Sequence, residues 1–166
     1  MIIFGIDPGT AVTGYGVIKV TDNRAAWVDS GIIATDSDVD LASRLAVIFD
    51  GLCSKIQQHK PGLVCIEEAF YAKNVHTTLL LGHARGVAML AANKAGAAVD
   101  EFSPREIKKS LVGNGNATKD QVAYMVKFML SPPVKHSQSD AYDALAVALT
   151  GFMNLSRRRI ESFRRS

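Results

Sequence analysis

Hydrophobic and polar positions in the first third of the chain follow the two-residue period of a β-sheet. Residues 1–7 form a mostly apolar run, and apolar and polar residues alternate over residues 14–20 and 26–35, which predicts three strands. Short turn-forming segments separate them, Pro8-Gly9-Thr10 and Asp22-Asn23-Arg24. Because strands joined by links this short pair antiparallel, we expect a three-stranded meander.

The pattern then changes to helices that alternate with short apolar strands. Leu41, Leu45, Ile48, Leu52 and Ile56 recur at helical spacing, which predicts an amphipathic helix over residues 40–58. The elements expected after it are strands over 63–68 and 96–102 and helices over 77–95, 104–112, 118–130 and about 139–154.

Two of these helices have recognisable starts. Ser103 is placed as a cap with Pro104 at the first helical position, and Thr118 with Gln121 forms a capping box. The order of elements predicts an α/β fold: a five-stranded mixed sheet, with its first three strands antiparallel and the later two added in parallel by helical crossovers, flanked by helices.

Length and composition agree with one globular domain. The chain has 166 residues, of which 48% are hydrophobic, enough for a substantial core. We expect a domain over residues 1–155 and a basic C-terminal tail over 156–166. Residues 151–166 carry five arginines against one glutamate, which suits either a solvated end or attraction to a polyanion.

Several classes of protein are disfavoured. The most apolar stretch, residues 77–99, contains His83, Arg85 and Lys94, a set that a membrane-spanning helix rarely tolerates. Met1 leads directly into the first strand, so we expect no signal peptide and a cytoplasmic location. Cys53 and Cys65 are isolated, without metal-type spacing, and are expected to be small buried hydrophobes.

Candidate chemistry begins with Asp7, a carboxylate at the end of the first strand, just before the Pro-Gly turn. A charge placed there is costly unless it is paired or binds something. Glu67 and Glu68 end the fourth strand, which can lie beside the first in a mixed sheet. Side-chain alternation allows only one of them to share the side of Asp7, and the sequence leaves open which.

A second acidic pair opens the last helix. Asp140 and Asp143 are three residues apart, so they share one helix face in the first turn. They could simply stabilise the helix N-terminus. Gathered with Asp7 and a strand-end glutamate, they would instead repel one another unless hard divalent cations were bound. We expect two Mg²⁺ ions, replaceable by Mn²⁺, at such a site. His136 could join it if the helix began early.

The motifs carry a family resemblance that runs in order along residues 1 to about 150. It is carried by the segments Gly5-Ile6-Asp7-Pro8-Gly9-Thr10, Ile66-Glu67-Glu68-Ala69-Phe70-Tyr71-Ala72-Lys73-Asn74, Leu81-Gly82-His83-Ala84-Arg85-Gly86-Val87, Lys108-Lys109-Ser110-Leu111-Val112-Gly113, Lys119-Asp120-Gln121-Val122 and Asp140-Ala141-Tyr142-Asp143-Ala144-Leu145-Ala146. These segments are similar to those of the RuvC family of Holliday junction resolvases.

The resemblance implies an RNase H-like fold and a homodimer that cuts four-way DNA junctions by paired symmetric nicks, in recombination and repair. It also implies two Mg²⁺ ions per active site and a branch-migration helicase complex as a partner. The four catalytic acids and metal ligands it implies are Asp7, Glu67, Asp140 and Asp143. Glu68 stands where the family often has glutamine.

The same resemblance suggests residues that contact DNA. Phe70 is placed as the aromatic that wedges between bases at the junction core, although composition alone suggests a core aromatic. Lys108 and Lys119 are placed to position phosphates or to stabilise developing charge. Further expected DNA contacts are Lys73, Asn74, Arg85 and Arg105. The apolar helix over residues 77–95, with Gly82 and Gly86, is expected either to be deeply buried or to pack against a second subunit.

Three alternatives remain at this point. A single-domain nuclease of the same fold could act on RNA. The segment Gly5 to Thr10 also resembles a phosphate loop of actin-like ATPases, although such proteins need a second domain and a second glycine-rich loop, for which this chain is too short. A junction-binding protein without catalysis would be expected to have lost one of the four acids.

Overall fold

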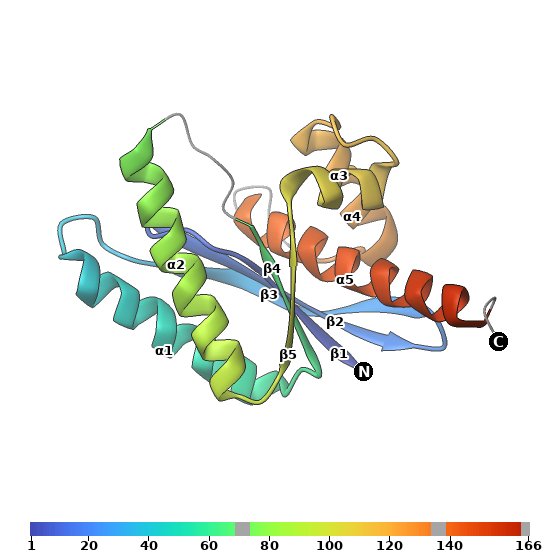
Figure 1. Ribbon diagram of the computed structural model, residues 1–166, viewed down its shortest axis with the longest axis horizontal. Coiled ribbons are helices and arrows are strands. Elements are labelled where there is room, and N and C mark those ends of the chain that lie inside the picture. The colour runs from blue at the N-terminus through green and yellow to red at the C-terminus, as the bar shows by residue number, and fades with distance from the viewer. Residues whose placement is uncertain (69–73, 134–138, 164–166) are drawn as a thin grey trace.

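A mixed β-sheet forms the centre of the computed structural model, which describes residues 1–68, 74–133 and 139–163. The strands within these residues lie in the order β3-β2-β1-β4-β5, with β1 antiparallel to β2, β2 antiparallel to β3, and β4 parallel to β1 and β5 (Figure 1). This arrangement confirms the predicted sheet. Their bounds are β1 Ile2–Asp7, β2 Val12–Thr21, β3 Arg24–Ala34, β4 Leu63–Glu67 and β5 Ala98–Phe102.

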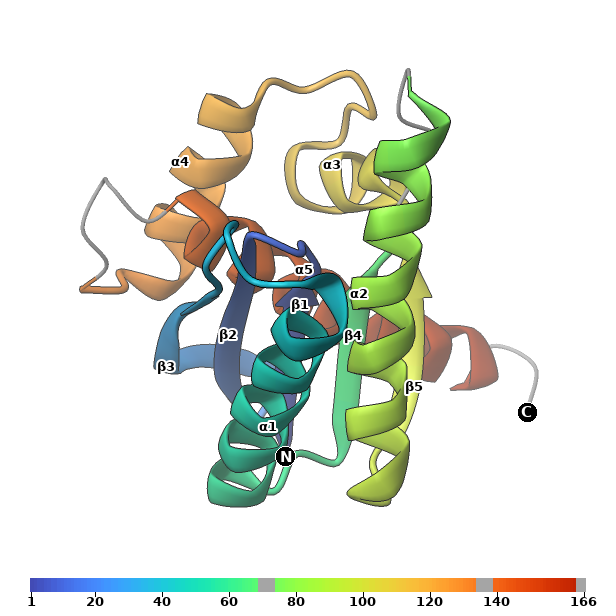
Figure 2. The ribbon, with the colours of Figure 1, turned by 90° about the vertical axis from the view of Figure 1, so that its left-hand side faces the viewer.

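Helices cover both faces of the sheet (Figures 1 and 2). Helices α1 (Leu41–His59) and α2 (Val75–Lys94) pack on one face, against Phe4 and Ile6 of β1. Helix α5 (Ser139–Phe163) crosses the other face, against Ile3 and Ile18, with α3 (Pro104–Val112) and α4 (Lys119–Leu130) packed onto it. Each face therefore has its own hydrophobic core, and neighbouring residues of β1 belong to different cores.

Helix starts follow their capping residues. Ser103 is the predicted cap of α3 and also forms a capping box with Glu106, and Thr118 forms the predicted capping box with Gln121. Asp40 caps α1 by accepting a hydrogen bond from the Ser43 backbone N–H. Cys65 is buried as predicted, whereas Cys53 is partly exposed on α1. Most observed bounds lie within two residues of the predicted ones.

The end of α5 is different from the prediction. The helix continues to Phe163, whereas its pattern predicted an end near Asn154. No glycine or proline interrupts the chain after Gly151, and arginine is a good helix former. The Ser156 hydroxyl also donates a hydrogen bond to Asn23 Oδ1 (3.1 Å), which ties the helix to the β2–β3 turn. Residues 156–163 are therefore helical, and the division into a domain and a basic tail stays a prediction.

Across the described residues, none of the helices has both the length and the continuous apolar character that crossing a bilayer requires.

Candidate active site

Asp7 is held at the end of β1 by a tight turn. The Thr13 side chain is fully buried, and its hydroxyl donates a 2.7 Å hydrogen bond to the Gly9 carbonyl. A Cβ atom at Gly9 would lie 2.3 Å from the Val12 carbonyl oxygen, so only glycine fits this turn. The turn directs the chain back into β2, where Gly14 pairs with Asp7. The carboxylate is thus fixed by backbone rather than by a flexible loop.

The register of the sheet shows which of Glu67 and Glu68 lies on the same side as Asp7. Ile6 pairs with Ile66, so Asp7 and Glu67 continue β1 and β4 side by side. Ile3 on β1 and Cys65 on β4 pack on the α5 face of the sheet. Asp7 is four residues after Ile3 and Glu67 is two residues after Cys65, so both carboxylates lie on that face, because side chains on one face recur every two residues. Glu68 follows Ile66 on the opposite face, where its charge acts on Arg85 of α2. The structure therefore gives Glu67, and not Glu68, to the side of Asp7.

Glycines in β1 and β2 let α5 lie directly on the sheet. A Cβ atom at Gly5 would lie 2.1 Å from the Ala144 carbonyl oxygen, and one at Gly14 would lie 2.1 Å from that of Asp140. A Cβ at Gly16 would similarly meet the backbone of Leu145 at 2.7 Å. Contacts this short mean that any larger residue would push the helix away. The first turn of α5 is therefore seated beside Asp7.

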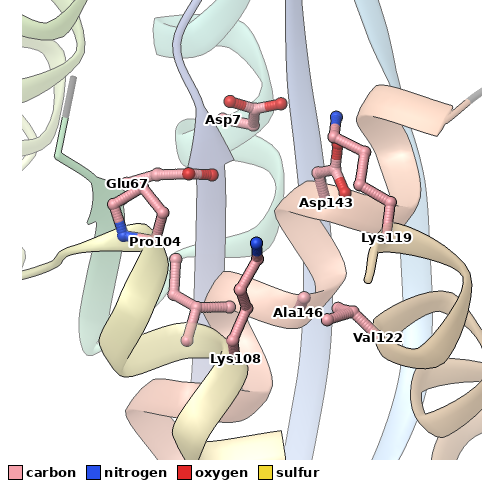
Figure 3. Close-up of a pocket in the computed structure, with 9 residues that line it drawn as sticks. Asp7, Glu67, Pro104, Lys108, Lys119, Val122, Asp143 and Ala146 are labelled. Atoms are coloured by element: carbon pink, nitrogen blue, oxygen red, sulfur yellow. The ribbon is translucent and has the colours of Figure 1, made fainter. Parts of the chain in front are cut away.

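These placements create a pocket of about 190 Å³ that is lined by both acids and lysines (Figure 3). Asp7, Glu67 and Asp143 reach it from β1, β4 and α5, and Lys108 and Lys119 reach it from α3 and α4. Pro104, Ile107, Val122 and Ala146 form its apolar walls. Figure 3 shows the Glu67 carboxylate and the Lys108 ammonium pointing into the same space below Asp7.

Burial and mutual repulsion make the acids reluctant to ionise. Loss of hydration, then the charges of Asp143 and Asp140, raise the pKa of Asp7 to about 7. Loss of hydration, then Asp7 and Asp143, raise the pKa of Glu67 to about 8, although the two lysines oppose the shift. Such raised pKa values are expected where several carboxylates share one site without a bound cation.

Lys119 partly compensates for this repulsion. Its Nζ lies 2.9 Å from Asp143 Oδ2, and this bond raises the pKa of Lys119. The lysine side chain remains 79% exposed, while the Asp143 side chain is 21% exposed. An exposed lysine paired with a half-buried carboxylate costs little to release. Lys119 can therefore move to a new partner when the charge in the pocket changes.

Asp140 lies near Asp7 but does not line the pocket. Its charge acts on Asp7, and the Ser139 hydroxyl donates a 3.5 Å hydrogen bond to Asp140 Oδ2. Within the described ranges, no three acidic, histidine or cysteine side chains are gathered closely enough to hold a metal ion as they stand. The all-oxygen donor set is nevertheless the one that Mg²⁺ and Mn²⁺ prefer, and a cation would relieve the repulsion.

The other residues expected to contact DNA have varied settings. Arg85 Nε lies 2.6 Å from Glu101 Oε1, in an ion pair between α2 and β5. Asn74 caps α2, because its side chain accepts a hydrogen bond from the His76 backbone N–H. Arg105 is exposed on α3. Phe70, Lys73 and His136 lie outside the described residues.

The close packing of α5 on the glycines of β1 and β2 was not predicted from the sequence. Gly14 and Gly16 stand at alternate positions of β2, and Gly16 pairs with Gly5 of β1. Ala144 and Ala148 of α5 face Gly5, while Gly14 meets Asp140 and Gly16 meets Leu145. A run of small residues on two paired strands and on one helix is the pattern that could have revealed the close approach. The apolar walls of the pocket, such as Ile107 and Val122, have no distinctive sequence pattern.

Comparison with known proteins identifies the family. The family described as "Crossover junction endodeoxyribonuclease RuvC" matches residues 3–151. The chain belongs to the RuvC family. Its relatives include the crossover junction endodeoxyribonuclease RuvC of Legionella pneumophila (strain Paris), which is 50% identical over 89% of this chain and 84% of the relative. The protein of the same name from Pseudoalteromonas atlantica is 51% identical over the same shares of the two chains.

A solved structure of the RuvC family also matches the fold. The structure described as Thermus thermophilus RuvC in complex with Holliday junction substrate has a TM-score of 0.83 and 31% sequence identity. The match covers 90% of this chain and 92% of that one. The expected RNase H-like architecture is therefore the observed one, and the resemblance seen in the motifs extends over residues 3–151.

Proposed function

We propose that this protein is a structure-selective endonuclease that resolves four-way DNA junctions by hydrolysing phosphodiester bonds. The observation that carries the proposal is the convergence of Asp7, Glu67 and Asp143 from three separate elements in one pocket that two lysines also line. Its RuvC relatives are named as crossover junction endodeoxyribonucleases, and a solved relative is described with a Holliday junction substrate. Recombination and DNA repair are the processes that such an activity serves.

The donor set supports two Mg²⁺ ions held by Asp7, Glu67, Asp140 and Asp143. Two divalent ions, when bound, would supply an activated water and stabilise the leaving oxygen. Asp7 and Glu67 must lose their protons to take part, and their raised pKa values mean that a bound cation has to favour the ionised forms. Asp140 lies in the first turn of α5 and Asp143 follows it on the same helix face, so a small shift of the start of the helix can bring both toward Asp7.

The lysines have complementary roles beside the acids. Lys108 points into the pocket from α3 and is suited to hold a non-bridging oxygen of the scissile phosphate. Lys119 is suited to leave Asp143 when a metal binds that carboxylate and to contact the phosphate instead. Phe70, Lys73, Asn74, Arg85 and Arg105 remain the proposed contacts with the junction arms and its core.

We infer that the protein acts as a homodimer, with α2 at the interface. One face of α2 packs on the sheet through Ala84, Ala88 and Ala92. The opposite face exposes apolar residues at helical spacing, with two glycines at which an added Cβ atom would meet no other atom within 4 Å. The members of this face, here called the α2 apolar face, are Val75, Leu79, Gly82, Gly86, Met89 and Leu90.

A second copy is the occupant that suits the α2 apolar face. Glycines allow two helices to approach closely, and an apolar face of this extent is rarely left in water. A two-fold dimer also presents two identical active sites to a two-fold junction, which explains paired symmetric nicks. A branch-migration helicase complex is the further partner that we propose, with the cytoplasm as the place of action.

The alternatives are less well supported. An actin-like ATPase needs a second domain around its nucleotide, and the family match to RuvC covers residues 3–151 of this chain. A junction-binding protein without catalysis would not retain the three acids of the pocket. An RNA-cutting nuclease of the same fold is best separated by experiment.

Labelled four-way junction, linear duplex and structured RNA should each be incubated with the protein, with and without Mg²⁺, and the nicks mapped at nucleotide resolution. We expect Mg²⁺-dependent nicks at symmetric positions in opposite strands of the junction, and little cleavage of the other two substrates. Preferential cleavage of RNA, or cleavage of the junction in EDTA, would contradict the proposal.

A further inference from the structure

Helix α4 exposes two aromatic side chains that the proposed chemistry does not use. Tyr124 is 67% exposed and Phe128 is 73% exposed. They are four residues apart, so their rings lie on the same helix face, one turn from each other. Aromatic rings are usually buried or half-buried, and two in one exposed patch indicate a surface that is covered when the protein works.

The patch adjoins the active site. A cavity of about 390 Å³ runs along α4 and the start of α5, and Tyr124 forms part of its lining. Lys119 and Asp143 line this cavity as well as the catalytic pocket. The two spaces therefore adjoin at this ion pair, so a group beside Tyr124 is close to a phosphate held at the acids.

The lining of the cavity is well ordered by its own contacts. Tyr142 is 6% exposed, and Lys127 Nζ lies 5.4 Å from the centre of its ring. Lys127 and Lys119 line the cavity together with Asp120 and Asp143, and the Tyr124 ring supplies an apolar surface. A flat aromatic ring combined with nearby cations is the arrangement that binds unpaired nucleotides.

We propose that Tyr124 stacks on a nucleobase of the cleaved strand, next to the scissile phosphate, and that Phe128 extends this stacking surface by one turn. The inference rests on the proposed function, because it needs the reacting phosphate at Asp7, Glu67 and Asp143. The Tyr124 subsite would hold the flanking nucleotide unstacked from its neighbour and so help to fix the position of the cut.

The position of the patch favours a nucleobase over a second protein. Helix α2, which carries the α2 apolar face, lies on the opposite side of the sheet from α4, so the two surfaces are not parts of one protein interface (Figure 2). The Tyr124 subsite is instead continuous with the catalytic pocket through Lys119 and Asp143. Its cavity is also within the size range of small-ligand sites.

Three variants of Tyr124 separate stacking from mere apolar contact. Tyr124→Phe keeps the ring, Tyr124→Leu keeps apolar bulk without an aromatic face, and Tyr124→Ala removes both. Val47→Ala on α1, where Val47 is 50% exposed, is the matched control on the other side of the sheet. Because Tyr124 is exposed, all of these variants should unfold at the wild-type temperature.

The direct measurement uses junctions in which 2-aminopurine replaces, one at a time, the nucleotides flanking the mapped cut. Binding is followed in EDTA, so that no cleavage occurs. With the wild type, Tyr124→Phe and Val47→Ala, we expect fluorescence at one flanking position to be quenched by stacking. Tyr124→Ala and Tyr124→Leu should lose the quenching. In Mg²⁺, they should cut that junction on the order of 10-fold more slowly in a single turnover.

The outcomes distinguish the two proposals. If the wild type nicks junctions but Tyr124→Ala shows the same quenching and the same rate, the stacking inference is wrong and the proposed function stands. Wild-type behaviour of Tyr124→Leu would likewise overturn it, because no π-face is then needed. A changed sedimentation coefficient for Tyr124→Ala, with unchanged quenching, would make the patch a protein contact and overturn it too. A wild type that nicks no junction overturns the proposed function itself.

Discussion

At the scale of single residues, Asp7 shows how a partly buried carboxylate opposes folding. Burial and neighbouring acids raise its pKa from the ordinary value of 3.8 to about 7. Below about pH 4 the carboxyl is protonated in both the folded and the unfolded chain. As the pH rises toward 7, the unfolded chain releases its proton first, so the stability that Asp7 contributes is lost. Glu67 extends this loss toward pH 8.

Asp7→Asn should therefore stabilise the metal-free protein while abolishing cleavage. In EDTA we expect a gain in unfolding free energy of up to about 4 kcal/mol at pH 8.5 and of about 1–2 kcal/mol at pH 5, because the pKa shift of Asp7 is about three units and each unit corresponds to about 1.4 kcal/mol. Thermal or urea unfolding of the variant and the wild type at the two pH values measures this gain in unfolding free energy, and junction cleavage measures activity. Asp50→Asn, at an exposed site on α1, is the control and should change neither. A gain in unfolding free energy that does not increase with pH would contradict the view that the charge of Asp7 destabilises the fold.

Lys119 should affect the chemical step more than the fold. Its ammonium is largely exposed, so Lys119→Ala should leave the unfolding temperature nearly unchanged. Loss of a cation that stabilises charge at the reacting phosphate should slow single-turnover cleavage about 100-fold at saturating protein. Junction affinity in EDTA should fall much less. If the rate constant is unchanged and only affinity falls, Lys119 acts as a positioning contact alone.

At the scale of whole elements, the seating of α5 on glycines positions two of the four acids. Gly14→Ala would place a Cβ about 2.1 Å from the Asp140 carbonyl oxygen, so the first turn of α5 has to move. We expect a loss of about 1–3 kcal/mol in stability and a large loss of cleavage. Unfolding curves and single-turnover rates measure the two effects. Gly62→Ala is the matched control, since its Cβ would lie 3.5 Å from Met1 Cγ, an ordinary contact. Wild-type stability and rate in Gly14→Ala would contradict the seating argument.

Helix α2 offers a test of the proposed dimer. Leu79 is 59% exposed in the subunit, so Leu79→Glu should fold normally but place a charge in the centre of the α2 apolar face. Sedimentation should then give a monomer where the wild type gives a dimer, and paired nicks should become single nicks. Val47→Glu, also on an exposed apolar position but on α1, should remain dimeric. Dimeric Leu79→Glu would exclude this face as the interface.

Local patterns predicted the elements well because their causes are local. The Ser103 and Thr118 capping boxes are short-range hydrogen bonds, and the helices begin where those residues indicate. The end of α5 could not be predicted in the same way, because it depends in part on the contact between Ser156 and Asn23, which are 133 residues apart. The choice between Glu67 and Glu68 depends on the register of β4 against β1, and the sequence of either strand alone does not determine that register.

For the molecule as a whole, the fold explains why acids so far apart in sequence form one site. The order of strands places the ends of β1 and β4 side by side, and α5, the last element in the chain, packs on the same sheet. The strand ends and the acidic helix start were visible in the sequence. The lysines of α3 and α4 and the apolar walls that close the pocket depend on how those helices pack on α5, which is a property of the complete fold.

Charge at the molecular scale is concentrated in the C-terminal residues, where Arg158, Arg159, Arg164 and Arg165 stand against Glu161. Removing residues 158–166 keeps the Ser156 contact with Asn23 and deletes these arginines. If they neutralise DNA phosphates, the slope of log affinity against log salt should become shallower, by roughly one unit per lost contact. Junction binding in EDTA over a series of salt concentrations measures the slope. The cleavage rate at saturating protein should not change, because the catalytic pocket is intact. An unaltered slope would mean that the basic residues make no contact with DNA and that the charge of the rest of the chain accounts for binding.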